Sequence, residues 1–325
     1  MVRFAASRLV WAVPIILVVL IASFVLTHVV PGDPITALVG EYPAPPEYVE
    51  KVRRSFGLDD SLAMQLWLHL ANLLRGDLGF SFANRQPVLA LVLDRAGKTL
   101  LLMVPALIAS SLLGIGLGML AASRRGGTAD AAVSALSLVG YSVPVFWLGQ
   151  VLIILFAVTV HWLPAQGMLS VRGGGSGLSA LPDFFLHWLL PGSATTLFYA
   201  AVVARVARAS LREALNQDFV ITAQAKGLSD REVLWKHVLP NALMPVISVI
   251  GYNFGNAITG TIMVEAVFGW PGIGGLFLGS IASRDYPVLQ GIFLLTSVIV
   301  ILANLATDLL YVVIDPRVRH GYIGR

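Results

Sequence analysis

The chain of 325 residues contains no cysteine, and only 12% of its residues are charged. The absence of cysteine excludes disulfide bonds and thiolate chemistry. The charged fraction is about half of the roughly 25% that is usual in a soluble domain. The remainder is strongly apolar, with 57% hydrophobic residues and a mean hydropathy of +0.80. This composition predicts a protein that crosses a membrane several times.

The sequence also lacks the motifs of the common catalytic and metal sites. Gly97, Lys98 and Thr99 resemble the end of a phosphate-binding loop, but Val92 stands where that loop needs its first glycine. The patterns G-x-S-x-G and H-E-x-x-H do not occur, and the six histidines are scattered along the chain. We therefore expect no catalytic residue, no metal site and no cofactor in this chain.

Six apolar segments are long enough for the roughly 20 residues that a spanning helix needs. Three of them hold no charged residue or histidine, which avoids a cost of about 2.5–3.5 kcal/mol per charge at a helix centre. The predicted fold is an all-α polytopic membrane protein with six transmembrane helices, at Leu9–Val30, Thr99–Ala122, Ala132–Val160, Trp188–Arg208, Pro240–Ile262 and Val288–Tyr311.

The distribution of lysine and arginine predicts the orientation of these helices. With the N-terminus in the cytoplasm, 13 of the 22 basic residues lie inside. Most of the others lie in one long outer loop, and the positive-inside rule gives long loops little weight because they cross the membrane regardless of charge. Six helices then place both termini in the cytoplasm. The first helix is interpreted as uncleaved, because its apolar run is longer than that of a signal peptide. The predicted domains are residues 1–30, an extracytoplasmic loop at 31–98 and a core at 99–325.

Several local patterns predict structure within this plan. Two helices are expected in the outer loop, at Glu47–Phe56 and Ser61–Leu74. Pro144 predicts a kink in the third apolar segment, and Trp270 is interpreted as an anchor at the membrane interface. Tight helix contacts are expected at the glycines of the second and fifth segments, namely Gly114, Gly116, Gly118, Gly251 and Gly255.

The segment Leu211–Pro240 is a charged island between two apolar segments, with eight charged residues among its thirty. Apolar residues every four positions predict one amphipathic helix over 211–226. Gly227 follows as a helix-ending glycine. Ser229 and Glu232 then form the pattern of a capping box at the start of a second helix. Acidic and basic residues balance, which favours a protein groove over an anionic lipid surface as the partner of this hairpin.

This island resembles the cytoplasmic coupling loop of the permeases of binding-protein-dependent ABC importers. The stretch NQDFVITAQAKGLS at 216–229 is similar to the form found in the oligopeptide and dipeptide branch. Further stretches resemble the same branch in the same order, and they run from the first helix to the C-terminus: PGDP at 31–34, FGLD at 56–59, LLRGDLGFS at 73–81, VEAVFGWPGIG at 264–274, RDYPVLQG at 284–291 and DLLYVVIDPR at 308–317.

The resemblance implies the first of two permease subunits of a peptide importer in a bacterial inner membrane. It implies a second homologous permease, two ABC ATPase subunits or one fused ATPase that bind the ATP and Mg, and an extracytoplasmic solute-binding protein. Nickel chelates, glutathione or sugars are alternative cargoes, and a self-contained secondary carrier is a rival function. No nucleic-acid partner is expected. The residues expected to contact the ATPase are Phe219, Thr222, Ala223, Ala225, Lys226 and Gly227.

Polar residues inside the predicted spans indicate where a substrate could pass. Asn253, Asn256 and Thr259 recur every three residues in the fifth segment, and we expect them either to line the passage or to bond to another helix. Asp308 in the sixth segment is expected to form an ion pair with Arg205 or Arg208 of the fourth.

Overall fold

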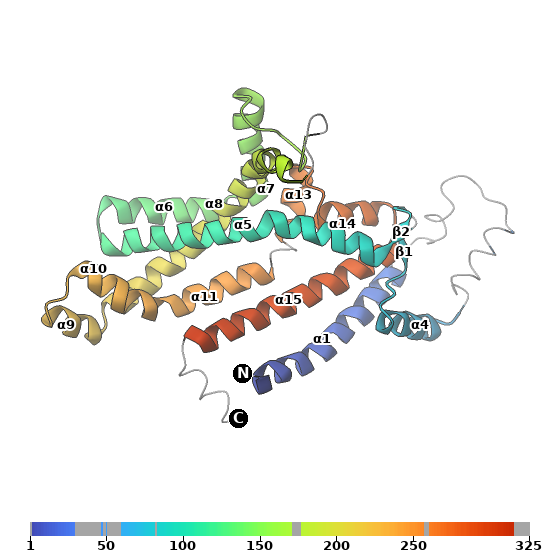
Figure 1. Ribbon diagram of the computed structural model, residues 1–325, viewed down its shortest axis with the longest axis horizontal. Coiled ribbons are helices and arrows are strands. Elements are labelled where there is room, and N and C mark those ends of the chain that lie inside the picture. The colour runs from blue at the N-terminus through green and yellow to red at the C-terminus, as the bar shows by residue number, and fades with distance from the viewer. Residues whose placement is uncertain are drawn as a thin grey trace. The chain divides into compact units, whose positions relative to one another are not determined.

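The computed structural model describes residues 2–29, 47, 50, 60–81, 83–170, 177–256 and 260–314. Helices form most of these residues (Figure 1). Packing divides the chain into two units, Met1–Thr99 with Pro271–Ile301 and Leu100–Trp270 with Leu302–Arg325. Helices α5 (Val88–Ser123) and α15 (Tyr286–Ile314) each run from one unit into the other. The predicted domain boundaries at residues 30 and 98 stay a prediction.

The remaining elements follow in chain order. They are α1 (Val2–Val29), α4 (Leu62–Leu74), β1 (Phe80–Ser81), β2 (Gln86–Pro87), α6 (Thr128–Ser142), α7 (Val145–Leu152), the π-helix η1 (Ile153–Thr159), the 3-10 helix η2 (Gly177–Ala180), α8 (Leu181–Leu215), α9 (Asp218–Ala225), α10 (Asp230–Glu232), the π-helix η3 (Val233–Val238), α11 (Leu239–Gly255), α13 (Ile262–Val267) and α14 (Ile273–Ala282).

Four helices in the described part of the chain are long and apolar enough to cross a membrane, at Val88–Ser123, Leu181–Leu215, Asp230–Gly255 and Tyr286–Leu309. A fifth span is obtained if α6 and the helix Val145–Thr159 count together, although they are bent by 100° at the break between them. The predicted kink at Pro144 is therefore confirmed, because this proline is the N-cap of α7. Helix α1 covers the first predicted segment.

Two spanning helices are much longer than their apolar cores. Helix α5 begins at Val88 instead of Thr99 and has 36 residues, which is about 54 Å at 1.5 Å per residue. Helix α8 has 35 residues and continues past the fourth predicted segment to Leu215. A bilayer core is only about 30 Å thick, so both helices carry turns beyond it. By contrast, α11 ends at Gly255, earlier than the predicted end at Ile262.

Glycines allow close approach between helices of the second unit. A Cβ atom added at Gly114 or Gly118 of α5 would lie 2.6 Å from the Cβ of Val203 or Ala207 of α8. A Cβ at Gly251 of α11 would lie 2.2 Å from the Thr307 side chain of α15. These predicted contacts are confirmed. Gly116 has nothing within 4 Å of its added Cβ, so its predicted contact is wrong.

Trp270 is buried, with 1% of its surface exposed, so it packs against protein and the prediction that it anchors the chain at the membrane interface is wrong. Its ring makes an edge contact with Phe184 of α8 at 5.8 Å between centroids. It joins an apolar cluster that connects α7, α8 and α13. The turn after α13 carries the indole inward, because the Trp270 amide donates to the Glu265 carbonyl at 2.9 Å.

The first unit contains a small antiparallel hairpin that an all-α fold did not predict. Strand β1 pairs with β2 in the register Phe80 to Pro87 and Ser81 to Gln86. The buried Ser81 hydroxyl donates to the Asp285 carboxylate at 2.5 Å, which ties the hairpin to the turn between α14 and α15. Helix α4 confirms the second predicted outer-loop helix, with Ser61 as its N-cap. The predicted helix Glu47–Phe56 lies largely outside the described residues.

The glycine contacts generate a matched pair of variants on one helix. Gly118→Val places methyl groups against Ala207 and the α8 backbone, and overpacking of this kind costs about 1–3 kcal/mol. Gly116→Val adds the same side chain where no atom lies within 4 Å. We expect the melting temperature of the purified protein to fall for Gly118→Val and to change little for Gly116→Val. Equal shifts for the two variants would contradict close packing of α5 on α8.

Candidate coupling site

The charged island contains the end of α8, the short helix α9, and then α10 and η3, which run without a break into α11 (Figure 1). The predicted single helix over 211–226 is wrong, because α8 ends at Leu215 and α9 begins at Asp218. Asn216 caps α8, and Gln217 has an extended backbone with ψ of 152°. Asn is a poor helix former in the interior because its amide competes for backbone groups. Asp218 then restarts the helix in the first turn, where the helix dipole favours a negative charge.

Gly227 ends α9 as predicted, in the left-handed region at φ of +80°. Its amide donates to the Gln224 carbonyl at 2.9 Å, and the Leu228 amide donates to the Ala223 carbonyl at 3.4 Å. This pair of bonds is a Schellman motif, and Leu228 packs against the apolar cluster that contains Ala223. The hinge is therefore a defined turn.

The second helix begins with the predicted capping box. The Ser229 hydroxyl accepts from the Glu232 amide at 3.4 Å, and the Glu232 carboxylate accepts from the Ser229 amide at 3.2 Å. Across the hinge, the Gln224 side-chain amide donates to the Asp230 carboxylate at 3.2 Å. The sequence predicted the cap correctly because all its partners lie within four residues.

The apolar stripe of the island packs inward and joins the core of the second unit. Ala223 is 5% exposed and Val220 is equally buried, while Leu215 and Phe219 are half-buried against the same cluster. The cluster includes residues of α5, α8, α9, η3 and α11, and its buried members are Ala122, Val203, Ala207, Leu211, Ala214, Val220, Ala223, Val233, Val238, Ala242 and Val246. Helix α9 therefore packs on the same core as α8 and α11.

The residues expected at an ATPase contact divide into two groups. Phe219 and Ala223 face the chain's own core, whereas Thr222, Ala225, Lys226 and Gly227 are exposed. Ile221 is 66% exposed on the same short helix, and the sequence argument did not include it. A single exposed apolar side chain is normal on a protein surface, so Ile221 is grouped with these residues only because it shares α9 with Thr222 and Ala225.

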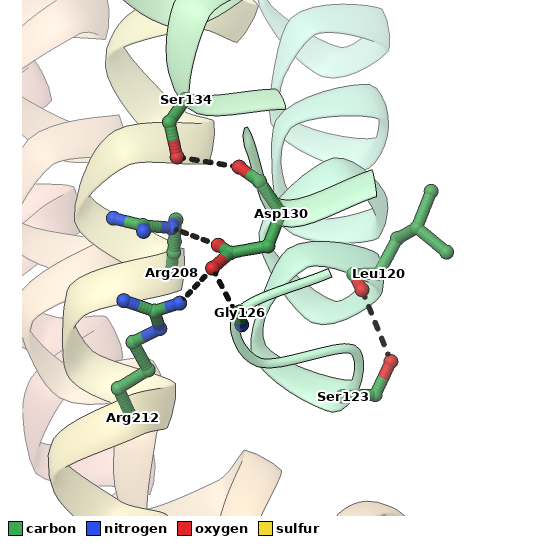
Figure 2. Close-up of polar contacts among 7 residues, drawn as sticks. All are labelled: Leu120, Ser123, Gly126, Asp130, Ser134, Arg208 and Arg212. Carbon is green, nitrogen blue, oxygen red and sulfur yellow. Dashed lines mark hydrogen bonds and ion pairs between the residues drawn. The ribbon is translucent and has the colours of Figure 1, made fainter. Parts of the chain in front are cut away.

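An ion-pair cluster braces α6 against α8 near this hairpin, and the sequence argument missed it. Figure 2 shows the Asp130 carboxylate pointing at two guanidinium groups that lie one turn apart on α8. Arg208 Nε lies 2.7 Å from Asp130 Oδ1, and Arg212 pairs with Oδ2. The Gly126 amide also donates to Oδ2 at 3.0 Å. Asp130 is only 5% exposed, so this brace is desolvated on the carboxylate side.

The brace corrects the predicted partner of Arg208. Arg208 was expected to form an ion pair with Asp308, but it pairs with Asp130, which lies 78 residues before it in the chain. Arg205 lies over the Tyr141 ring at 5.6 Å. Arg125 Nη1 donates to the Asn216 side chain at 3.1 Å, so the α5–α6 connection also touches the break between α8 and α9. Asp130 was missed because its partners are distant in sequence and no local pattern marks them.

The predicted pathway residues lie at the end of α11. Asn253 is buried at 5% exposure, and the Asn256 side-chain amide donates to the Tyr252 carbonyl at 3.0 Å. Thr259 lies outside the described residues. A different set of residues forms the exposed stripe of α11, and these are Asn241, Pro245, Ser248 and Tyr252. Tyr252 is 68% exposed, which places a hydroxyl on the free face of an apolar helix.

The sequence of this chain matches two known protein families. Residues 114–320 match the family described as binding-protein-dependent transport system inner membrane component. Residues 1–103 match the N-terminal family of the same components. The chain belongs to this family. The resemblance inferred from the coupling segment is thereby confirmed, and the permease is a multi-pass protein of the inner membrane.

Curated relatives align with the permease over almost its whole length. It is 39% identical to the "probable peptide ABC transporter permease protein y4tP" of Sinorhizobium fredii, over 96% of this chain and 98% of the relative. It is 36% identical to the dipeptide transport system permease protein DppB of Escherichia coli, over 98% and 99%. It is 37% identical to the glutathione transport system permease protein GsiC of Escherichia coli, over 98% and 100%.

A solved structure shares the fold. The inward-facing MetNI methionine ABC transporter contains a chain that matches with a TM-score of 0.56 at 18% identity, over 69% of the permease and 96% of that chain. At this identity the match supports the fold alone. It agrees with the helical architecture described above.

The brace predicts a specific loss of stability. Asp130→Asn removes the carboxylate that two arginines of α8 share, and it leaves Arg208 and Arg212 close together without their counter-charge. We expect the melting temperature of the purified permease to fall. Glu213→Gln removes one negative charge at an exposed position of α8 and should leave the melting temperature unchanged.

A double-mutant cycle separates the ion pair from a general effect of charge. Asp130→Asn combined with Arg208→Gln should destabilise the protein by less than the sum of the single variants, because the second change removes an arginine that the first left unpaired. Additive losses would contradict direct coupling between the two side chains.

Proposed function

We propose that this chain is a permease subunit of an ATP-driven importer that takes up dipeptides or oligopeptides delivered by a solute-binding protein. The observation that carries the proposal is the alignment with peptide and dipeptide permeases over 96–98% of the chain. The arrangement of the island as an internally packed hairpin with exposed polar residues supports it.

The proposed assembly contains a second homologous permease and two ATPase subunits, or one fused ATPase, on the cytoplasmic side. In this assembly the chain has six spans with both termini in the cytoplasm. The proposed contact with the ATPase consists of Thr222, Ala225, Lys226 and Gly227, with Ile221 as an apolar addition. Phe219 and Ala223 support this surface from below by packing on the core. ATP and Mg are bound by the partner subunits.

ATP-driven closure of the ATPases would move α9, and the shared apolar core would carry this movement into α8 and α11. The Asp130 brace adds α6 to the moving group, because its carboxylate binds two arginines of α8. A set of helices that moves as one body opens a passage on one side while it closes the other. The chain therefore converts an external movement into alternating access and performs no chemistry itself.

The passage is proposed to run along the free face of α11, where Ser248 and Tyr252 are exposed. Hydroxyl groups can bond to a peptide backbone without selecting side chains. Asn253, Asn256 and Thr259 stay candidates for the same pathway. Glutathione is a second candidate cargo, because a glutathione permease aligns as completely as the dipeptide permeases do.

The hinge of the coupling hairpin generates a matched pair of variants. Gly227 has φ of +80°, and an added Cβ would meet no atom within 4 Å. A substitution there would be strained only by the backbone conformation and would not clash with neighbouring atoms. Valine resists this region, whereas asparagine enters it readily. In the assembled importer, Gly227→Val should lower peptide uptake per ATP hydrolysed, and Gly227→Asn should preserve it. Equal ratios for the two variants would contradict a role for the turn in coupling.

Reconstitution tests the function itself. The permease, co-expressed with the proposed partner subunits, should co-purify with an ATPase, and vesicles that hold the complex should accumulate labelled dialanine only with ATP and the solute-binding protein. Vesicles that hold this chain alone should not accumulate it. Robust uptake by the isolated chain would favour a self-contained carrier, and uptake of glutathione but not dialanine would favour the second candidate.

A further inference from the structure

A cavity of about 320 Å³ lies in the first unit, between the turn of the β1–β2 hairpin, the start of α5 and helix α14. This volume is at the lower end of the range for small-molecule sites. Polar side chains from all three elements border it, namely Asn84, Arg95, Ser280 and Ser283. No carboxylate is among the described residues that line it.

Two hydrogen-bond donors at this cavity have no hydrogen-bond partner among the described residues. They are the Nε of Arg95 and the hydroxyl of Ser280, and both atoms are buried. Ser280 as a whole is 2% exposed. Buried donors are paired in nearly all native structures, and an exception calls for an explanation such as an ordered water, an ion or another bound group with acceptor atoms. Their common position at one cavity points to a ligand with acceptor atoms.

The positive charge of Arg95 at the cavity favours a negatively charged acceptor. Arg95 Nη1 donates to the Pro271 carbonyl at 3.2 Å, which fixes the guanidinium without neutralising it. The carboxylate of Asp94 lies 4.0 Å from Arg95 Nε, but it is held by Lys98 at 2.6 Å. A positively charged group with a neighbouring hydroxyl is suited to a carboxylate, because charge-assisted hydrogen bonds are the stronger ones.

The walls leave room for the group that carries this carboxylate. Gly275 and Gly279 of α14 line the cavity, and an atom added at the Cβ position of Gly279 would meet nothing within 4 Å. A volume of about 320 Å³ has room for the terminal residue of a peptide. A short peptide has a carboxylate of this kind at its end.

We propose that this cavity binds the C-terminal carboxylate of a short peptide, with Arg95 as the counter-charge and Ser280 as a hydrogen-bond donor. The proposal rests on peptide import as the proposed function and adds a binding site to it. Helix α5 is longer than a bilayer is thick, and Arg95 lies in its first turns before the apolar core that begins at Thr99. The site therefore lies outside the membrane core, where a peptide can enter from water.

The absence of cysteine from the chain permits a direct test. Gly279→Cys introduces a single thiol at the cavity, and Gly97→Cys introduces one at an exposed position of α5 that does not line the cavity. Labelling with a negatively charged methanethiosulfonate is followed on this subunit in the purified complex without the solute-binding protein. Dialanine and its C-terminal amide, at equal concentrations, serve as the probes.

Dialanine should slow the labelling of Gly279→Cys, while the amide should have little effect and neither probe should alter the labelling of Gly97→Cys. Adding Arg95→Gln to Gly279→Cys should abolish protection by dialanine and slow the negatively charged reagent about three- to tenfold relative to a positively charged one. Equal protection by peptide and amide, or none by either, would overturn the proposal.

This measurement is independent of transport. If the wild-type complex accumulates dialanine and Gly279→Cys is not protected, the carboxylate site is wrong and the proposed function stands. If protection is found and no peptide accumulates, the site stands as a carboxylate site and peptide import is wrong.

Discussion

The close packing of α8 on its neighbours is the constraint on which the rest of the second unit depends. Gly114 and Gly118 bring α5 against α8 at distances that admit no side chain. The Asp130 carboxylate then joins α6 to the same helix through Arg208 and Arg212. Small residues supply close contact where lipid provides no hydrophobic drive for association. An ion pair with one desolvated partner adds a preferred register to this contact.

The packing of α8 on its neighbours also positions the coupling hairpin. The hairpin leaves α8 after Leu215 and returns into α11, and its buried residues share one cluster with both helices. The Schellman turn at Gly227 and the capping box at Ser229 end one helix and start the next within four residues. The hairpin therefore has defined turns, it packs on the same core as α8, and its second arm continues into α11. These properties are needed if an external subunit is to move the permease through it.

The first unit shows how a compact polar region forms beside apolar helices. The Ser81 hydroxyl bonds to the buried Asp285 carboxylate, and burial raises the pKa of Asp285 although this bond opposes the shift. The hairpin that carries Ser81 also supplies Asn84 to the cavity next to Arg95. The same contacts that order this region thus leave a cationic cavity at its surface.

Local interactions explain which features were predictable. The kink at Pro144, the turn at Gly227 and the capping box at Ser229 all arise from residues within a few positions of one another, and each was found as expected. Of the six predicted spans, four match described helices that are long and apolar enough to cross a membrane, and a fifth does if the bent pair at Pro144 counts as one span. The family was equally accessible, because its coupling motif is contiguous. The break at Asn216 was missed because an apolar stripe continues across it, and helical periodicity does not register a short interruption.

Contacts between distant residues were decided only when the chain folded. The burial of Trp270, the pairing of Asp130 with Arg208 and Arg212, and the cavity at Arg95 each join segments that lie far apart in sequence. A tryptophan after a membrane helix has the same local pattern whether it faces lipid or protein, and an aspartate at a helix start has the same pattern whether it is solvated or paired. Hydropathy and residue spacing therefore determined the helices and the hinge. Tertiary packing decided which side chains meet, because residues far apart in the sequence come together only in the folded chain, and local patterns do not show which of them will be neighbours.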